Sequence, residues 1–179
     1  MDAPISGGAI KAGEGALTIM ASGTAEAFQQ SRACLDAMAM TVFELGDNAG
    51  QGSLMKSVNQ MLAGIHIAAM AEALSFGMKQ GLDPQTFLDV IQKCAGTSWM
   101  LENRTPHIIE GDYSPKSAVN IWLKDLGIVL DAAATIDFEA PITQTVLQQY
   151  KGAADMGLGR EDDAAVVKLY AAQNALNLP

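Results

Sequence analysis

The sequence has few aromatic residues, few charged residues and only two cysteines. Aromatic residues make up 6% and charged residues 17% of the 179 residues. Cys34 and Cys94 lie far apart in the sequence and do not form a Cys-x-x-Cys motif. This usage excludes a disulfide framework and fits a reduced cytosolic compartment. Both cysteines are expected to be small buried hydrophobic residues.

Positive charge is also scarce. The chain has 11 Lys and Arg against 20 Asp and Glu, which gives a net charge of -9. No basic cluster is present, so we expect no nucleic-acid partner and no docking on anionic membranes. The N-terminus lacks a signal-peptide pattern. Lys56, His66 and Glu72 interrupt the longest apolar stretch, which falls short of the ~18 uncharged residues of a membrane span. We therefore predict a cytoplasmic protein.

The sequence contains neither a convincing dinucleotide-binding turn nor the spacing of a metal site. Gly13-Glu14-Gly15 begins like Gly-x-Gly-x-x-Gly, but a strand is expected after it rather than before it, which indicates an ordinary turn. His66 and His107 are isolated in the sequence, so no metal ligands are assigned. We expect His66 to be a hydrogen-bonded core residue, and favour a loop residue over a substrate contact for His107.

A short α/β segment opens the chain. Strands are expected over residues 16–21 and 41–45, with a helix between them that Thr24 caps. Two or three strands and one helix do not close a stable domain by themselves. Residues 1–50 are therefore predicted to be the C-terminal remnant of a Rossmann-type domain whose earlier part is missing from the chain.

Residues 51–179 are predicted to be all-helical, which makes the fold mainly α. A helix over residues 53 to about 80 is apolar almost all round, as in a helix that is buried on most sides. At roughly 40 Å it would form a central shaft. Further helices are expected over residues 84–94, 99–104, 118–135, 142–156 and 162–175. Hydrophobic residues make up 49% of the chain, which indicates a deep core or a large partner surface.

Two of the candidate functional stretches lie in the first third of the chain. In the first, Asp2-Ala3-Pro4-Ile5-Ser6-Gly7-Gly8, the glycines after Ser6 can expose backbone N–H groups to a carboxylate. In the second, helical spacing places Asn59 and Gln60 on the same face as Lys56. An ammonium group beside amides could handle a substrate hydroxyl and its proton. Taken singly, the first is also a common turn and Lys56 a solvated charge.

The third candidate stretch is Lys124-Asp125, a charged pair inside an apolar helix. Such a pair costs free energy unless it is partnered. It is therefore either an ion pair that staples the fold or a contact to a ligand, and the helical pattern does not choose between them.

In this order, the three stretches resemble the motifs of the β-hydroxyacid dehydrogenase family, which includes 3-hydroxyisobutyrate and 6-phosphogluconate dehydrogenases. Asp2–Gly8 is similar to its substrate-binding signature, Gly50-x-Gly52-x-x-x-Lys56 to its catalytic-lysine motif, and Lys124-Asp125-Leu126 to its C-terminal motif. Residues 62–69, 98–104 and 111–119 are similar to the L-threonate dehydrogenase branch.

The resemblance implies a role for each candidate. Ser6, Gly7 and Gly8 would hold the substrate carboxylate, and Lys56 would take the hydroxyl proton as hydride leaves for the nicotinamide. Many family members place Asn four positions after the lysine, where this chain has Gln60, so Asn59 and Gln60 both stay candidates for substrate binding. Lys124 would contact the cofactor, and Asp125 would orient the site.

The resemblance also implies an NAD- or NADP-dependent oxidoreductase that acts on a small hydroxy acid such as L-threonate or 3-hydroxyisobutyrate. The main cofactor-binding turn would precede Met1, so this chain alone is expected to be inactive. Family members pair through their helical domains, which implies a homodimer or tetramer. The alternatives are a non-catalytic helical dimerisation module and an imine-reductase-like relative, against which Lys56 argues.

Overall fold

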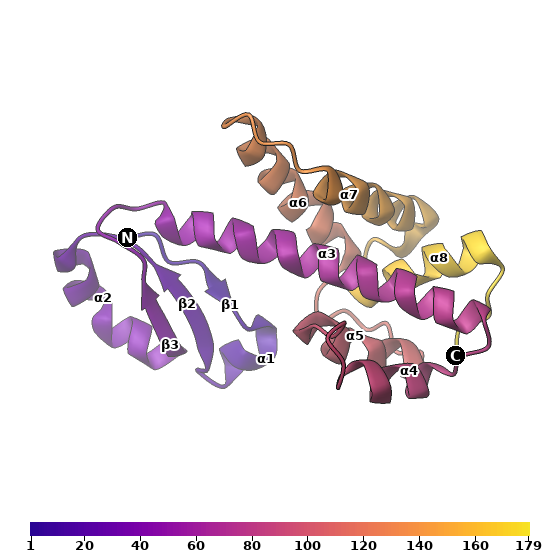
Figure 1. The fold of residues 1–179 in the computed structure, drawn as a ribbon. Coiled ribbons are helices and arrows are strands. Elements are labelled where there is room, and N and C mark those ends of the chain that lie inside the picture. The colour runs from indigo at the N-terminus through magenta and orange to yellow at the C-terminus, as the bar shows by residue number, and fades with distance from the viewer. The chain divides into compact units, whose positions relative to one another are not determined.

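A computed structural model describes residues 1–179, and its internal contacts divide the chain into two compact units, Met1–Asn59 and Gln60–Pro179. The chain forms eight α-helices and one three-stranded sheet (Figure 1). The prediction of a mainly α fold is thereby confirmed. The division falls inside helix α3 (Gln51–Lys79).

The first unit contains the sheet. Its strands are β1 (Ile5–Ser6), β2 (Leu17–Ala21) and β3 (Ala39–Glu44), in that spatial order. β1 pairs antiparallel with β2, and β2 pairs parallel with β3. A parallel pair needs a crossover connection, which helix α2 (Ala25–Met38) supplies. α2 begins as predicted, since the Thr24 hydroxyl accepts a hydrogen bond from the Ala27 N–H at 3.2 Å.

Helix α1 (Gly8–Gly13) was not predicted, because Ser6-Gly7-Gly8 was expected to form only a turn. The chain does turn at Gly7, where φ is 132°, but a six-residue helix with no buried residue follows directly. Such a helix has no apolar stripe and leaves no periodic signal in the sequence. The expectation of buried cysteines is also wrong, because Cys34 and Cys94 are both exposed.

The second unit is all-helical. After the rest of α3 come α4 (Pro84–Ile91), α5 (Trp99–Glu110), α6 (Val119–Ala134), α7 (Pro141–Ala153) and α8 (Val166–Asn174). A π-helical turn, Ala154–Leu158, follows α7, and a 3-10 turn, Asp163–Ala165, precedes α8. Residues 99–104 were expected to be a short helix, but α5 runs to Glu110 with Pro106 inside it, a position at which proline normally ends a helix.

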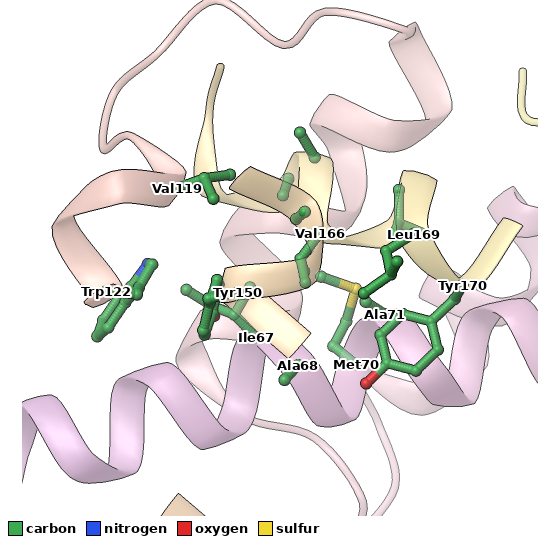
Figure 2. Close-up of a cluster of buried hydrophobic side chains, with 14 of the residues drawn as sticks. Ile67, Ala68, Met70, Ala71, Val119, Trp122, Tyr150, Val166, Leu169 and Tyr170 are labelled. Carbon is green, nitrogen blue, oxygen red and sulfur yellow. The ribbon is translucent and has the colours of Figure 1, made fainter. Parts of the chain in front are cut away.

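The core of the second unit lies between α3 and the helices that follow it. Ile67, Met70 and Ala71 of α3 are buried with Val166 and Leu169 of α8 (Figure 2). α3 is long and apolar enough to cross a membrane by length and composition alone. Half of its apolar window is buried inside the protein, however, which is also the pattern of a core helix in a soluble protein.

A close approach of α3 and α6 fixes one side of this core. A Cβ atom at Gly64 of α3 would lie 3.0 Å from the side chains of Trp122 and Leu126. The Tyr150 hydroxyl of α7 donates a hydrogen bond to the Gly64 carbonyl at 3.1 Å, and its ring stacks on Trp122 with centroids 5.7 Å apart. Because Gly64 has no side chain, α3, α6 and α7 can pack closely against one another at this point.

Candidate functional site

In the first unit, the start of α3 is held by a side chain from the N-terminus of the chain. The Asp2 carboxylate accepts hydrogen bonds from the Gly50 N–H at 3.1 Å, the Ser53 N–H at 2.7 Å and the Ser53 hydroxyl at 2.8 Å. The first N–H groups of a helix have no partner within the helix, so Asp2 acts as a cap from a distant part of the sequence. These bonds, led by that of the Ser53 N–H, lower the pKa of Asp2.

Gly52 brings the first turn of α3 against the end of β2. Its N–H donates to the Ser22 hydroxyl at 3.1 Å, and Ser22 exchanges two backbone hydrogen bonds with Asp2, at 2.7 and 2.8 Å. A Cβ atom at Gly52 would lie 2.2 Å from the backbone oxygen of Met20. Gly52 is thus explained by packing, because any side chain there would push the helix off the sheet, whereas Gly50 is explained by its φ of 114°.

Lys56 and Asn59 follow on α3, and both are half-buried. The helix is continuous from Gln51 to Lys79, so the three- and four-residue spacing places Lys56, Asn59 and Gln60 on one side of it. This much of the predicted site geometry follows from the helix itself.

The segment Ser6-Gly7-Gly8 lies where β1 ends and α1 begins. Gly7 and Gly8 have φ values of 132° and 68°, both in the region that favours glycine. A Cβ atom at Gly7 would also lie 2.7 Å from that of Lys11. Glycine is the residue that adopts these conformations at little cost, so the two glycines shape the turn between β1 and α1.

In the second unit, Gln60, Lys124 and Asp125 form a connected group. The Gln60 side-chain N–H donates to Asp125 Oδ2 at 2.6 Å, and Lys124 Nζ lies 2.8 Å from Asp125 Oδ1. The Asp125 side chain is 13% exposed and that of Lys124 is 69% exposed. Asp125 thus joins the two side chains, and the ammonium of Lys124 lies in solvent where a ligand could reach it. The Lys124–Asp125 ion pair, one of the two alternatives for this charged pair in the sequence, is therefore present.

The sequence reasoning placed His107 in a loop, and this is wrong. His107 lies in α5 and is 5% exposed. Its Nε2 is 2.8 Å from Lys116 Nζ, and its Nδ1 is 3.2 Å from Asp162 Oδ1. A lysine ammonium has only protons to donate, so the contact with Lys116 requires Nε2 to be the acceptor. His107 therefore contacts the loop after α5 through Lys116, and its Nδ1 lies near Asp162 without a hydrogen bond.

A buried charge cluster beside His107 was also missed. Arg104 Nε lies 2.5 Å from Asp163 Oδ1, and the Trp122 indole N–H donates to Asp163 Oδ2 at 3.0 Å. Burial raises the pKa of Asp163, and the hydrogen bond and charge of Arg104 oppose that rise without cancelling it. Burial acts to lower the pKa of Arg104, but its bond to Asp163 leaves that pKa raised. The Arg104 Nε and Trp122 indole donors, together with Arg104 Nη2 at 3.3 Å from Asp163 Oδ2, favour the ionised form of Asp163 against the effect of burial.

The donor set for a dinucleotide is incomplete in this chain. Lys124 offers an exposed cation, which fits a phosphate or an amide oxygen. The Gly13-Glu14-Gly15 turn follows α1 and precedes β2, the reverse of the strand–turn–helix order that cradles a pyrophosphate. The Gly13-Glu14-Gly15 turn therefore does not fit a pyrophosphate, and Lys124 is a cation that solvent can reach.

Comparison with known proteins identifies relatives of both units. A family model described as the NAD-binding domain of NADP-dependent 3-hydroxyisobutyrate dehydrogenase matches residues 50–170. One described as the NAD-binding domain of 6-phosphogluconate dehydrogenase matches residues 1–46. An L-threonate dehydrogenase from Cupriavidus necator is 49% identical over 95% of this chain and 57% of its own length.

Two solved structures have the same fold. A protein described as 3-hydroxyisobutyrate dehydrogenase from Salmonella typhimurium superimposes with a TM-score of 0.90 at 46% identity, over 94% of this chain and 59% of that one. The Mycobacterium tuberculosis 3-hydroxyisobutyrate dehydrogenase, in a structure with L-serine, gives a TM-score of 0.83 at 31% identity, over 93% and 59%. The chain therefore spans less than three fifths of the length of these relatives.

Proposed function

Because the chain belongs to the 3-hydroxyisobutyrate dehydrogenase-like family, whose members use NAD(P), we propose that it supplies the substrate side of an NAD(P)-dependent hydroxy-acid dehydrogenase. Identities of 44–49% to proteins named L-threonate dehydrogenase support a four-carbon sugar acid as substrate. The observation that carries the proposal is the position of Lys56 on a helix whose first turn is fixed to the sheet.

A nicotinamide bound in the complete protein would supply the hydride acceptor for the carbon that bears the substrate hydroxyl. Lys56 takes the hydroxyl proton during oxidation and returns it during reduction. An acid–base lysine works best with a pKa lowered to roughly 7–8. Ser6, Gly7 and Gly8 hold the substrate carboxylate through backbone N–H groups, and Asn59 contacts the substrate. Lys124 binds the cofactor.

We assign Gln60 to the cofactor side of the site. Its side-chain N–H already donates to Asp125, which holds Lys124. Gln60 would therefore fix the direction of the Lys124 ammonium through Asp125, while Asn59 acts on the substrate. The substitutions Gln60→Leu and Asn59→Leu are matched neighbours that separate these roles.

We expect Gln60→Leu to weaken binding of the reduced cofactor, because a bond to a charged acceptor is worth roughly 1.5 kcal/mol, or about tenfold. Fluorescence titration of the reduced nicotinamide measures this without turnover. Asn59→Leu should raise the substrate KM and leave cofactor binding unchanged. A rise in substrate KM alone for Gln60→Leu would reverse the assignment.

The central test of the proposed function is Lys56→Ala in the complete protein that carries this chain. Loss of a general acid–base group lowers turnover by about 10²- to 10⁴-fold, and we expect a fall in kcat within that range. Lys151→Ala, at an exposed position of α7, is the matched control and should keep full activity. Unchanged turnover in Lys56→Ala would contradict the acid–base role and favour a non-catalytic dimerisation module.

We also propose that the protein is a cytoplasmic homodimer or tetramer. Large apolar side chains are exposed on the second unit around the connection between α6 and α7, at Ile136, Phe138 and Ile142, with exposures of 73%, 57% and 64%. Light scattering measures the assembly state. Ile136→Lys should shift it toward the monomer if these residues pack against another copy.

A further inference from the structure

We propose that Asp2 is a positioning residue, which sets the placement of the Lys56 helix relative to the carboxylate-binding segment Ser6–Gly8. This inference rests on the proposed function, because it assumes that Lys56 moves the proton and that Ser6–Gly8 hold the carboxylate. It assigns to the first residue of the substrate-binding signature a task other than touching the substrate.

The chemistry of the Asp2 contacts requires a carboxylate. Oδ2 accepts from the N–H groups of Gly50 and Ser53, and Oδ1 accepts from the Ser53 hydroxyl. An ionised carboxylate has acceptors on both oxygens and no donor. Asparagine would turn an NH₂ group toward one of these donors, so it could keep only part of the arrangement. The negative charge also complements the positive end of the α3 dipole.

The backbone from Asp2 to Ser6 runs along β2 as one extended segment. Asp2 and Ser22 exchange backbone hydrogen bonds, the Pro4 carbonyl accepts from the Met20 N–H at 2.9 Å, and Ser6 lies opposite Thr18. At ~3.4 Å per residue, this segment is about 14 Å long. It is bonded to the first turn of α3 at one end and leads into Gly7 at the other. One extended segment therefore fixes both the first turn of α3 and the start of the Ser6–Gly8 segment.

Lys56 is close enough along α3 to follow any movement of its first turn. Ser53 precedes it by three residues, which is ~4.5 Å of helix rise. A misplacement of about 1 Å between reacting groups can cost about 10²-fold in rate. Release of the Asp2 bonds would let the helix start shift against the strand that holds Ser6, so Lys56 would lose its alignment with a correctly held carboxylate.

The test compares Asp2→Asn with wild type in the complete protein with its cofactor, at a temperature where circular dichroism shows both to be folded. We expect kcat to fall at least tenfold. The inhibition constant of butyrate, a carboxylate without a hydroxyl, should stay within twofold, because it needs only the carboxylate segment. A purely structural role would leave kcat of the folded variant unchanged. Asp36→Asn, an exposed aspartate of α2 in the same unit, is the control and should match wild type.

Ser53→Ala removes only the hydroxyl bond and provides a second measurement if Asp2→Asn does not fold. We expect it to lower kcat by about threefold with unchanged butyrate inhibition. Wild-type kcat in folded Asp2→Asn, or in Ser53→Ala where Asp2→Asn does not fold, overturns the inference. Lys56→Ala is measured in parallel: if it is inactive while the Asp2 variant is normal, only the positioning role fails, whereas an active Lys56→Ala removes the proposed function as well.

Discussion

Asp2 of the first unit and Asp163 of the second unit are two carboxylates that the fold satisfies in different ways. Asp2 accepts hydrogen bonds from backbone N–H groups and a hydroxyl at a helix start. Asp163 is fully buried and faces Arg104 and the Trp122 indole. The pKa of Asp2 is lowered, chiefly by the Ser53 N–H, whereas burial raises the pKa of Asp163.

The two carboxylates differ in what their partners cost in free energy. Neutral dipoles at the start of α3, chiefly the Ser53 N–H, favour the ionised form of Asp2 and outweigh the opposing effect of desolvation. The Arg104–Asp163 pair gains Coulomb energy but must leave water, and such pairs often contribute little net stability. The Arg104–Asp163 pair instead fixes the orientation of α5 relative to the 3-10 turn before α8, because it joins the two elements. Asp2 therefore stabilises the first unit, whereas Asp163 fixes how α5 and the 3-10 turn of the second unit are joined.

The largest effect is expected when the buried pair is broken on one side. Asp163→Ala leaves the Arg104 charge uncompensated, which costs about 3–5 kcal/mol of unfolding free energy. Denaturant titration measures it. The double variant Arg104→Met with Asp163→Leu should recover most of that loss, since an apolar pair of similar volume is often neutral or stabilising. A double variant as unstable as the single one would show that the pair does contribute stability.

An intermediate effect of opposite sign in the two units is expected for two helical glycines. Gly52→Ala places a Cβ atom against the Met20 backbone oxygen, and overpacking of this kind costs about 1–3 kcal/mol. Gly127→Ala in α6 meets open space and should gain about 1 kcal/mol from helix propensity. Denaturant titration measures the change in unfolding free energy for each variant. Equal changes for Gly52→Ala and Gly127→Ala would contradict the close approach of α3 to β2.

The smallest effect is expected from the titration of Asp2. Its folded pKa lies below its unfolded value of about 3.9, so its contribution is present above pH ~4 and is lost as the pH falls through the folded pKa. Hydrogen-exchange protection factors, which correct for the intrinsic exchange rate at each pH, should fall with acid at the first turn of α3 in wild type and much less in Asp2→Asn. Asp163 has a raised pKa and acts in the opposite direction, since its ionisation costs stability as the pH rises above about 4. Equal acid sensitivity of wild type and Asp2→Asn would remove this contrast.

Local signals predicted much of the fold. Thr24 marked the start of α2, and its capping bond is present. The helix expected from residue 84 is found as α4, whose first turn is capped by Asp83. Long-range pairing was not readable in the same way. Asp163 meets Arg104 across 59 positions, and Asp125 meets Gln60 across 65, and nothing near those residues indicates the partner. Sequence reasoning found the motif residues that resemble a known family and missed the buried partners of α5.

Helix α3 also limits how this protein can be recombined. The boundary between the two units lies between Asn59 and Gln60, inside an unbroken helix. A chimera joined there to a relative must keep the helical phase, because each inserted residue turns the following residues of α3 by ~100° and advances them by ~1.5 Å. Exchange of either unit therefore has to be made residue for residue along α3, and a flexible linker at the boundary would destroy the face that carries Lys56, Asn59 and Gln60.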